Sequence, residues 1–192
     1  MRLFLAVSPD DRARRSLGAV HAGLERSFGD ASPAVRWVSV AAAHLTVHFL
    51  GEVDASRLPI LVEALGTDVP IEAFVVELGA PEVSPSHGAP RVVWMPVATG
   101  RDALARVHDA LGARLRSADV SLDARPFAPH LTIGRVRDRE RARARTLRAR
   151  IGGAQVDRVG WRVDHVTLFH SDLSGPSPVY AVRHTIALGH AT

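Results

Sequence analysis

The sequence contains no cysteine. This absence excludes disulfide bonds, thiolate metal sites and a cysteine nucleophile, and it suits a reducing compartment. A long apolar segment is also missing at the start, where residues 3–7 form an apolar run of only five residues. Such a run is too short for a signal-peptide core and cannot span a bilayer. We therefore expect a cytoplasmic protein with no membrane contact.

Lysine is absent as well, so all 24 basic residues are arginine, and the net charge is +4. Two explanations stay open. Codon bias could have replaced lysine throughout, or arginine could be used because its planar guanidinium binds phosphate through two hydrogen bonds and never deprotonates. The excess of positive charge is compatible with a polyanionic partner.

The 192 residues suffice for one full-sized domain or for two small lobes that share a core. Apolar residues alternate with period 2 in some segments and recur with period 3.6 in others, which predicts an α+β protein. We expect strands at residues 2–7, within 38–50, and at 71–78, 91–97, 130–136, 162–170 and 178–188. We expect helices at residues 9–28 (capped by Ser8), 56–65, 101–117 and 139–151, and a loop at 79–90. The order indicates two similar halves that pack as lobes around a cleft, with residues 1–192 as a single domain.

A four-residue phrase occurs once in each half, as HLTV from His44 and as HLTI from His130. In a strand, residues two apart share a face, so His44, Thr46 and His48 would line one side. His130 and Thr132 repeat that arrangement. Each strand would then present an imidazole beside a hydroxyl to the same surface.

The phrase has two other interpretations. The four-residue spacing of His44 and His48 is typical of a metal-binding helix, but Thr46, Val47 and Phe49 favour a strand, and no carboxylate follows His44. We therefore expect no metal. Histidine and threonine could also be merely tolerated on half-exposed strands, yet two copies in the same register favour a site.

Two imidazoles and two hydroxyls are suited to phosphodiester chemistry. One histidine can be neutral and act as a base while the other is protonated and acts as an acid, because the ordinary pKa is ~6.5. Hydroxyls can donate hydrogen bonds to non-bridging oxygens, on which negative charge builds during in-line attack.

The paired phrases resemble the hallmark of the 2H phosphoesterases, and further phrases resemble their RNA 2′,3′-cyclic phosphodiesterase (2′-5′ RNA ligase-like) branch. These phrases are RLFLAV at 2–7, RWV at 36–38, HLTVHFLGEV at 44–53, PRVVW at 90–94, RPFAPHLTIGRVR at 125–137 and HSDLSGPSPVY at 170–180. The resemblance implies a bilobal α+β fold of two pseudo-symmetric halves, with antiparallel sheets facing a central cleft and helices outside. It also implies hydrolysis without metal or cofactor of an RNA 2′,3′-cyclic phosphate end to a 2′-phosphate.

The resemblance implies a role for five residues. His130 is the general base that activates water, and His44 is the general acid that protonates the leaving 3′ oxygen. Thr46 and Thr132 hold the phosphate. Arg135 matches a further phosphate-contacting position, although strict alternation puts it on the opposite face from His130. It reaches the groove only if the strand ends or bulges near Gly134.

Three features keep two interpretations each. His48 stands where similar proteins often have lysine, and it either donates near the phosphate or covers the sheet. Phe127 belongs to the core or stacks on a base at the cleft. The run 135–150 contains eight arginines in 16 residues. It is either a solvated helix face or a patch that binds the RNA backbone.

The expected partner is RNA with a 2′,3′-cyclic phosphate terminus, such as tRNA fragments or oligonucleotides, and the protein is expected to be a monomer. A rival within the enzyme class acts on another cyclic or 2′-5′ linked nucleotide. A rival outside it binds RNA ends without turnover. The reverse reaction, ligation through a 2′-5′ bond, is chemically allowed by the same site.

Overall fold

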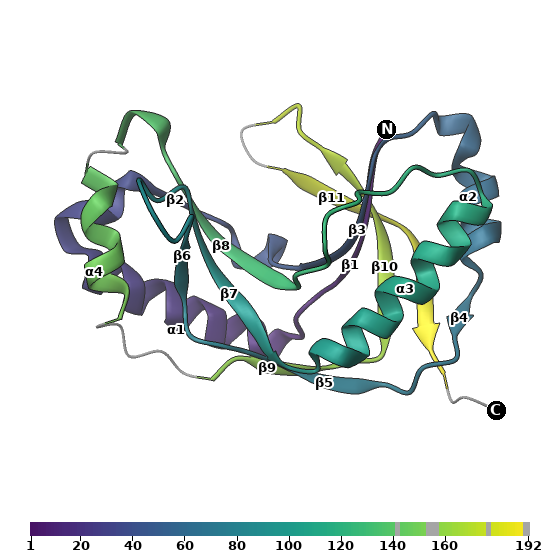
Figure 1. Cartoon of the computed structure of the whole chain (residues 1–192), viewed down its shortest axis with the longest axis horizontal. Coiled ribbons are helices and arrows are strands. Elements are labelled where there is room, and N and C mark those ends of the chain that lie inside the picture. Colours follow the sequence, from purple (N-terminus) through teal and green to yellow (C-terminus); the bar gives the residue numbers. More distant parts are fainter. Residues whose placement is uncertain (141–142, 153–157, 176–177, 190–192) are drawn as a thin grey trace.

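The structure is a computed structural model that describes residues 1–140, 143–152, 158–175 and 178–189. Its helices are α1 (Asp11–Phe28), α2 (Leu58–Leu65), α3 (Arg101–Ser117) and α4 (Leu147–Ile151). Its strands are β1 (Arg2–Val7), β2 (Val35–Trp37), β3 (Leu45–Glu52), β4 (Asp68–Val69), β5 (Phe74–Leu78), β6 (Glu82–Ser84), β7 (Val92–Thr99), β8 (His130–Val136), β9 (Gly160–Val163), β10 (His165–Asp172) and β11 (Val179–Leu188). The predicted α+β class is confirmed (Figure 1).

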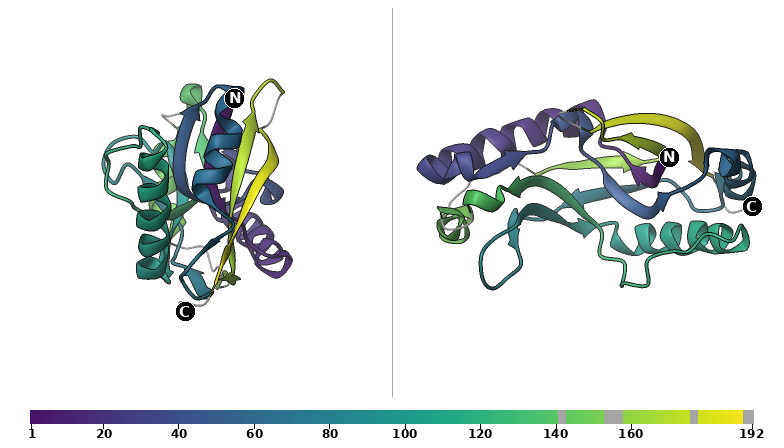
Figure 2. Two further views of the ribbon diagram at one scale, coloured as in Figure 1. Left: turned by 90° about the vertical axis from the view of Figure 1, so that its right-hand side faces the viewer. Right: turned by 90° about the horizontal axis from the view of Figure 1, so that it is seen from above.

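The strands are joined edge to edge in the order β4-β11-β10-β1-β3-β8-β7-β5-β9, with β2 beside β8 and β6 beside β7. All neighbours are antiparallel except β11 and β4. The β1 lobe consists of β1, β3, β4, β10 and β11 with α2 and α3, and the β8 lobe consists of the remaining strands with α1 and α4 (Figure 1). Helices α1 and α3 lie at opposite ends and on opposite sides of the molecule (Figure 2).

The order of elements in the sequence suggested that each half of the chain forms one lobe. In the structure the two lobes do not correspond to consecutive halves of the chain. Strand β10, near the end of the described chain, pairs with β1, and β11 pairs with β10. The strand expected at residues 162–170 is in fact two strands, β9 and β10, which separate at Asp164 and enter different lobes. Each lobe therefore contains segments from both halves of the sequence.

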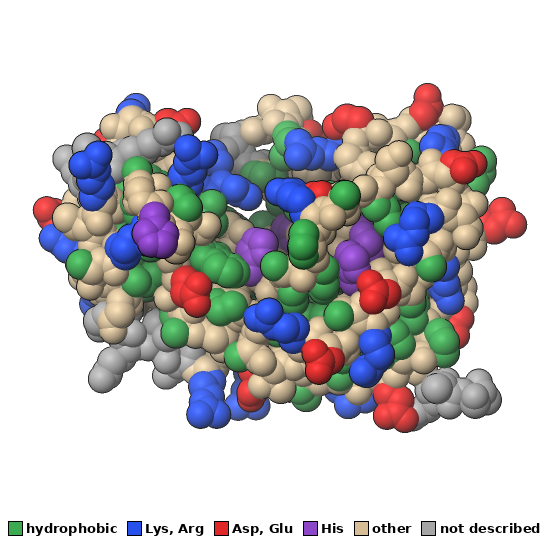
Figure 3. All heavy atoms as spheres, viewed as in Figure 1, with side chains coloured by type: hydrophobic (Ala, Val, Ile, Leu, Met, Phe, Trp, Pro, Cys, Tyr) green, Lys and Arg blue, Asp and Glu red, His purple; other side chains and the backbone are tan. Residues whose placement is uncertain are grey.

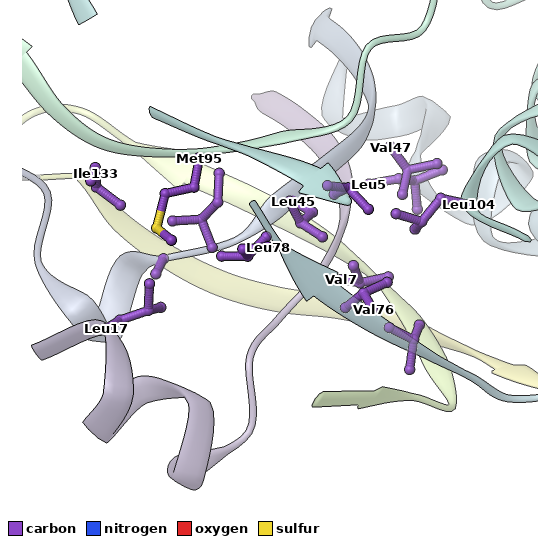
Figure 4. Packing of buried hydrophobic residues seen from close by; sticks show 14 of the residues in the cluster. Leu5, Val7, Leu17, Leu45, Val47, Val76, Leu78, Met95, Leu104 and Ile133 are labelled. Atoms are coloured by element: carbon purple, nitrogen blue, oxygen red, sulfur yellow. The ribbon is translucent and has the colours of Figure 1, made fainter. Parts of the chain in front are cut away.

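One continuous apolar core runs through both lobes. The lobes meet where β3 and β8 pair at a single position, Leu45 opposite Leu131, and both side chains are buried. In Figure 4, Leu45 lies between a group around Met95 and a group around Leu5 and Leu104. The two strands that carry the repeated phrase are thus held by the same core through Leu45 and Leu131.

Local differences from the predicted elements have identifiable causes. Helix α1 is capped by Asp10, whose carboxylate accepts a hydrogen bond from the Ala13 amide at 2.7 Å, and not by Ser8. The helix expected at 139–151 is interrupted, and only its last turn forms α4. The proline-rich segment 79–90 contains the short strand β6. Among the described residues no helix is both long and apolar enough to cross a bilayer.

Candidate active site

The repeated phrases lie on β3 and β8, and both strands bulge at the residue that follows the threonine. On β3, Thr46 pairs with Ala6 while His48 pairs with Leu5, which leaves Val47 as the extra residue. On β8, Thr132 pairs with Trp94 and Gly134 with Val93, which leaves Ile133 as the extra residue. The burial pattern from the leucine onward is the same for five residues in both strands. Each bulge reverses the face to which later residues point.

Both catalytic candidates are oriented by their own backbone. The Nδ1 atom of His44 lies 2.8 Å from the Ala42 carbonyl oxygen, and Nδ1 of His130 lies 2.8 Å from the Ala128 carbonyl oxygen. A carbonyl oxygen can only accept, so each ring donates through Nδ1. In the neutral ring Nε2 is then the acceptor, and in the protonated ring it is a donor. The two imidazoles therefore share one tautomer.

The pairing of Leu45 with Leu131 brings the two phrases together. Extending this antiparallel register by one residue in each direction puts His44 opposite Thr132, and Thr46 opposite His130. Directly opposed Cα atoms in such pairs lie about 4.5–5.5 Å apart. An approximate two-fold axis between the two leucines thus relates the imidazoles to each other and the hydroxyls to each other.

The electrostatics of the site is dominated by positive charge. Burial lowers the pKa of His44 below 6.5, the hydrogen bond with Ala42 opposes this, and the charges of Arg135 and His130 lower the pKa further. Burial raises the pKa of Tyr180, and the positive charges of Arg135 and Arg2 oppose that rise. Among the residues that the structure describes, no carboxylate is one of the groups that shift the pKa of His44. The site is therefore arranged to receive an anion.

Arg135 faces the groove, because β8 bulges before it and thereby meets the condition set by the alternation of the strand. Arg135 pairs with Val92 on β7, and Thr132 pairs with Trp94 on the same strand. Val92 and Trp94 are two residues apart and share a face, so Arg135 and Thr132 share that face too. The bulge lies at Ile133, one residue before Gly134. A Cβ atom on Gly134 would lie 2.5 Å from Cγ1 of Val35, on the face opposite Arg135, which explains why glycine fits there.

Each imidazole lies beside at least one aromatic ring. Phe4 lies 4.9 Å from His44 and Tyr180 lies 5.3 Å from it, centroid to centroid, the latter edge-on. Trp94 meets His130 edge-on at 5.1 Å. Sequence reasoning did not single out Phe4 and Tyr180. Both occur in the phrases that carry the resemblance, which is the signal that could have identified them.

A small cavity adjoins His44, and its other lining residues include Tyr180, Phe169 and the segment 41–43. Arg14 fixes the backbone there, because its Nη1 atom donates to the carbonyl oxygens of Val40 at 3.0 Å and Ala41 at 2.7 Å. In Figure 3 the molecule is hollowed between the lobes, and arginine side chains gather around the rim of the hollow.

A family model described as the 2′-5′ RNA ligase superfamily matches residues 4–175. The chain belongs to this superfamily. Its 2H phosphoesterase signature is the pair of phrases whose geometry is given above. The match covers both histidines and both strands that carry them.

Individual relatives agree with this assignment. A protein of Archaeoglobus fulgidus named RNA 2′,3′-cyclic phosphodiesterase is 32% identical over 137 residues, which cover 71% of this chain and 73% of the relative. One of Methanocaldococcus jannaschii with the same name is 28% identical over 183 residues, 95% of this chain and 98% of the relative.

Solved structures show the same fold. The protein TT0787 of Thermus thermophilus matches with a TM-score of 0.74 and 23% identity over 100% of both chains. LigT of E. coli, solved as a complex with 3′-AMP, matches with a TM-score of 0.74 and 22% identity over 97% of both chains.

In this 2′-5′ RNA ligase superfamily member, two predicted cleft residues lie elsewhere. The bulge at Val47 turns His48 to the helix side, where it is 6% exposed and donates from Nε2 to the His108 carbonyl oxygen at 2.8 Å. Its ring stacks on His108 at 4.0 Å, and Phe127 stacks on the other face of His108 at 4.3 Å. The prediction that His48 shares the face of His44 is therefore wrong. Phe127 thus packs on a residue of α3, His108, and forms part of this stack.

The bulge brings Phe49 to the groove in place of His48. Phe49 is 56% exposed and lies beside Phe4, with 6.4 Å between ring centroids.

In the part of the superfamily member that the structure describes, no three histidine or carboxylate side chains form a group that could hold a metal ion. Of the arginine-rich run, residues 141–142 lie outside the described residues. Arg148 and Arg150 donate to backbone oxygens of Pro85 and Phe28, so these two stabilise the β8 lobe.

Proposed function

We propose that the protein hydrolyses RNA 2′,3′-cyclic phosphate ends to 2′-phosphate ends. The observation that carries this proposal is the pair of imidazoles with the same Nδ1-bonded tautomer, flanked by two hydroxyls and Arg135 around one two-fold axis. The names of the relatives support the choice of substrate.

In the proposed reaction, Nε2 of His130 takes a proton from water, and the water oxygen attacks phosphorus. The bond from phosphorus to the 3′ oxygen breaks, and Nε2 of His44 gives that oxygen a proton. Thr46, Thr132 and Arg135 stabilise the charge that develops on the two non-bridging oxygens. The product carries a 2′-phosphate and a free 3′ hydroxyl, and both histidines have exchanged their protonation states.

The lowered pKa of His44 bears on this assignment. In the free protein, burial and the positive charge of Arg135 favour the neutral ring of His44. A bound phosphate adds a negative charge between His44 and Arg135, which favours the protonated ring. We therefore propose that substrate binding itself raises the pKa of His44, so that His44 is protonated and can act as the general acid.

The aromatic rings near His44 would receive the nucleoside. An in-line reaction puts the leaving 3′ oxygen, and with it the ribose, on the side of His44. Tyr180 and Phe169 line the cavity on that side, and the buried Phe4 packs against both rings. Single-stranded RNA is commonly bound by stacking of bases on such partly exposed rings.

Residues 1–192 would form one catalytic unit, active as a monomer in the cytoplasm. Support comes from the site itself, because one chain supplies both histidines and the cavity beside them. The same site could run the reverse reaction if a 5′-hydroxyl end replaced water, and it could act on another 2′-5′ linked or cyclic nucleotide.

The test is incubation of an oligonucleotide that ends in a 2′,3′-cyclic phosphate with the protein in excess EDTA, followed by ³¹P NMR. We expect the cyclic phosphate signal to be replaced by that of a 2′-phosphate monoester. Binding without any product would favour an RNA-end binding protein instead. Activity that returns only after a metal is added would contradict the two-histidine mechanism.

A further inference from the structure

Two arginines face each other across neighbouring strands at the groove. Arg36 on β2 is the direct antiparallel partner of Arg135 on β8. Directly opposed residues point to the same face, so Arg36 shares the groove face with Arg135. Both side chains are exposed. Neighbouring strands lie about 4.8 Å apart, so the two arginine side chains project from adjacent backbone positions on one surface of the sheet.

The charges of this pair are not compensated within the described protein. Several other arginines, such as Arg14, Arg57 and Arg114, donate to backbone carbonyl oxygens. No carboxylate or backbone oxygen of the described residues accepts a hydrogen bond from the guanidinium of Arg36 or Arg135. Like charges directly opposite each other destabilise a sheet. A pair kept in this arrangement is suited to binding anions.

The reacting phosphate does not need both guanidinium groups. A cyclic phosphodiester has two non-bridging oxygens, and the proposed site already offers them the hydroxyls of Thr46 and Thr132 and the guanidinium of Arg135. Arg135 lies on the same strand as Thr132, whereas Arg36 lies one strand farther from it, on β2. This leaves the donors of Arg36 for a different phosphate.

We propose that Arg36 binds a second, non-reacting phosphate of the RNA strand, and that it thereby makes the enzyme prefer oligonucleotides to mononucleotides. This inference rests on the proposed function of the same site. The guanidinium fork matches phosphate oxygens in a two-bonded geometry. A nucleoside 2′,3′-cyclic monophosphate contains no second phosphate, so it gains nothing from Arg36.

The experiment compares Arg36→Gln with wild type on two substrates, a nucleoside 2′,3′-cyclic monophosphate and a short RNA with the same terminal nucleotide and a cyclic end. We expect kcat/KM for the RNA to fall about 10- to 100-fold, the usual value of a hydrogen-bonded charge. The value for the mononucleotide should stay within about two-fold of wild type, because no group that Arg36 contacts is present.

Two further variants sharpen the comparison. Arg36→Lys keeps the charge and loses the fork, so it should recover part of the loss on RNA only. Arg162→Gln removes an exposed arginine on β9, at the far end of the sheet order, and should change neither substrate. Circular dichroism of each variant checks that the fold is retained.

A binding measurement separates this inference from the proposed function. Fluorescence anisotropy with a non-cyclic RNA that ends in a 3′-phosphate is measured over a range of salt concentrations. We expect Arg36→Gln to reduce the slope of log affinity against log salt by about 0.7, the value for one phosphate of a single strand. This readout applies even if wild type hydrolyses neither substrate, an outcome that would refute the proposed function.

Two outcomes would overturn the inference. Equal losses of kcat/KM on the RNA and the mononucleotide would mean that Arg36 acts at the reacting phosphate. An unchanged salt slope together with unchanged kcat/KM on RNA would mean that it contacts no phosphate.

Discussion

Phe49 occupies on β3 the position that Arg135 occupies on β8. Each residue comes five positions after the first histidine of its repeated phrase, and each is turned to the groove by a bulge after the threonine. Both are exposed. The same β-bulge therefore occurs in both strands, but the side chain that it turns to the groove differs. It is the guanidinium of Arg135 on β8 and the phenyl ring of Phe49 on β3. The two sides of the groove are equivalent in geometry and different in chemistry.

Phe49 is expected to contribute to nucleotide binding. Phe49→Ser should raise KM for a cyclic nucleotide about 5- to 150-fold, because stacking of a base on a ring contributes about 1–3 kcal/mol. Hydrolysis of a cyclic phosphate without a base should be unaffected. Ile60→Ser is the matched control, since Ile60 is 54% exposed on α2. Equal effects on both substrates would contradict a role in base stacking.

Each histidine of the pair is expected to be necessary. His44→Ala and His130→Ala should each lower kcat by about 10²- to 10⁴-fold, because each removes one proton transfer. His87→Ala, at an exposed histidine in the segment between β6 and β7, should retain full activity. The measurement is steady-state turnover of a 2′,3′-cyclic mononucleotide. Near-normal turnover in either site variant would rule out the proposed division of roles.

Arg135 is expected to set the pH range of activity. Its positive charge lowers the pKa of His44, in addition to the larger effect of burial. Arg135→Gln should therefore raise the pKa of His44. If His44 is the general acid, the alkaline limb of the kcat/KM profile moves to higher pH, because the proton is retained longer. NMR titration of the His44 ring in both proteins gives the same shift directly. A shift to lower pH would contradict the assignment.

His48 is expected to make stability depend on pH. Burial lowers its pKa in the folded protein, with further lowering by His108 and Arg116 and opposition from the hydrogen bond to His108. The unfolded state then binds the proton more readily, so stability is lost as the pH falls below about 6.5. His48→Gln keeps a donor for the His108 carbonyl but does not titrate.

Urea unfolding at pH 8 and pH 5.5 measures this effect. Wild type should lose more unfolding free energy between the two pH values than His48→Gln does. His21 and His44 also have lowered pKa values and remain in both proteins, so only the difference reports on His48. Equal losses would show that His48 is not a source of the pH dependence.

Gly134 is expected to be required for the position of β2. Gly134→Ala would put a Cβ atom 2.5 Å from Cγ1 of Val35, a buried β-branched side chain that cannot move away freely. We expect a loss of about 1–3 kcal/mol in unfolding free energy, typical of overpacking. Addition of Val35→Ala should relieve part of that loss. Gly18→Ala, where the added atom meets nothing within 4 Å, should not destabilise.

The sequence was sufficient to place the two histidines of the proposed catalytic pair at corresponding positions beside two strands, because local patterns specify those strands. Alternation of apolar and polar residues identifies the strands that begin near His44 and at His130, and the repeated threonine two positions later fixes the shared face. The boundaries of β1, α3 and β8 were also predicted correctly. These elements have strong periodicity or a clear glycine boundary, so little depends on the rest of the molecule.

What could not be predicted depends on pairing between distant segments. A bulge is defined by the partner strand, so nothing in HLTVHF shows that Val47 is the extra residue and that His48 turns inward. Arg36 belongs to the phrase RWV, but the phrase gave it no role, because the proposed role of Arg36 comes from lying opposite Arg135. The division of residues 162–170 between two lobes likewise follows from long-range pairing of β10 with β1.

The interleaved strands have a consequence for the order in which the site is completed during synthesis. Strand β1 is made first, yet one of its two neighbours is β10, and the ring of Tyr180 that packs on His44 belongs to β11. A ribosome that has released everything up to β9 has supplied both histidines but only part of the wall beside His44. Since long-range pairing forms late and slowly, the growing chain carries both proposed catalytic histidines before the ring of Tyr180 can pack on His44.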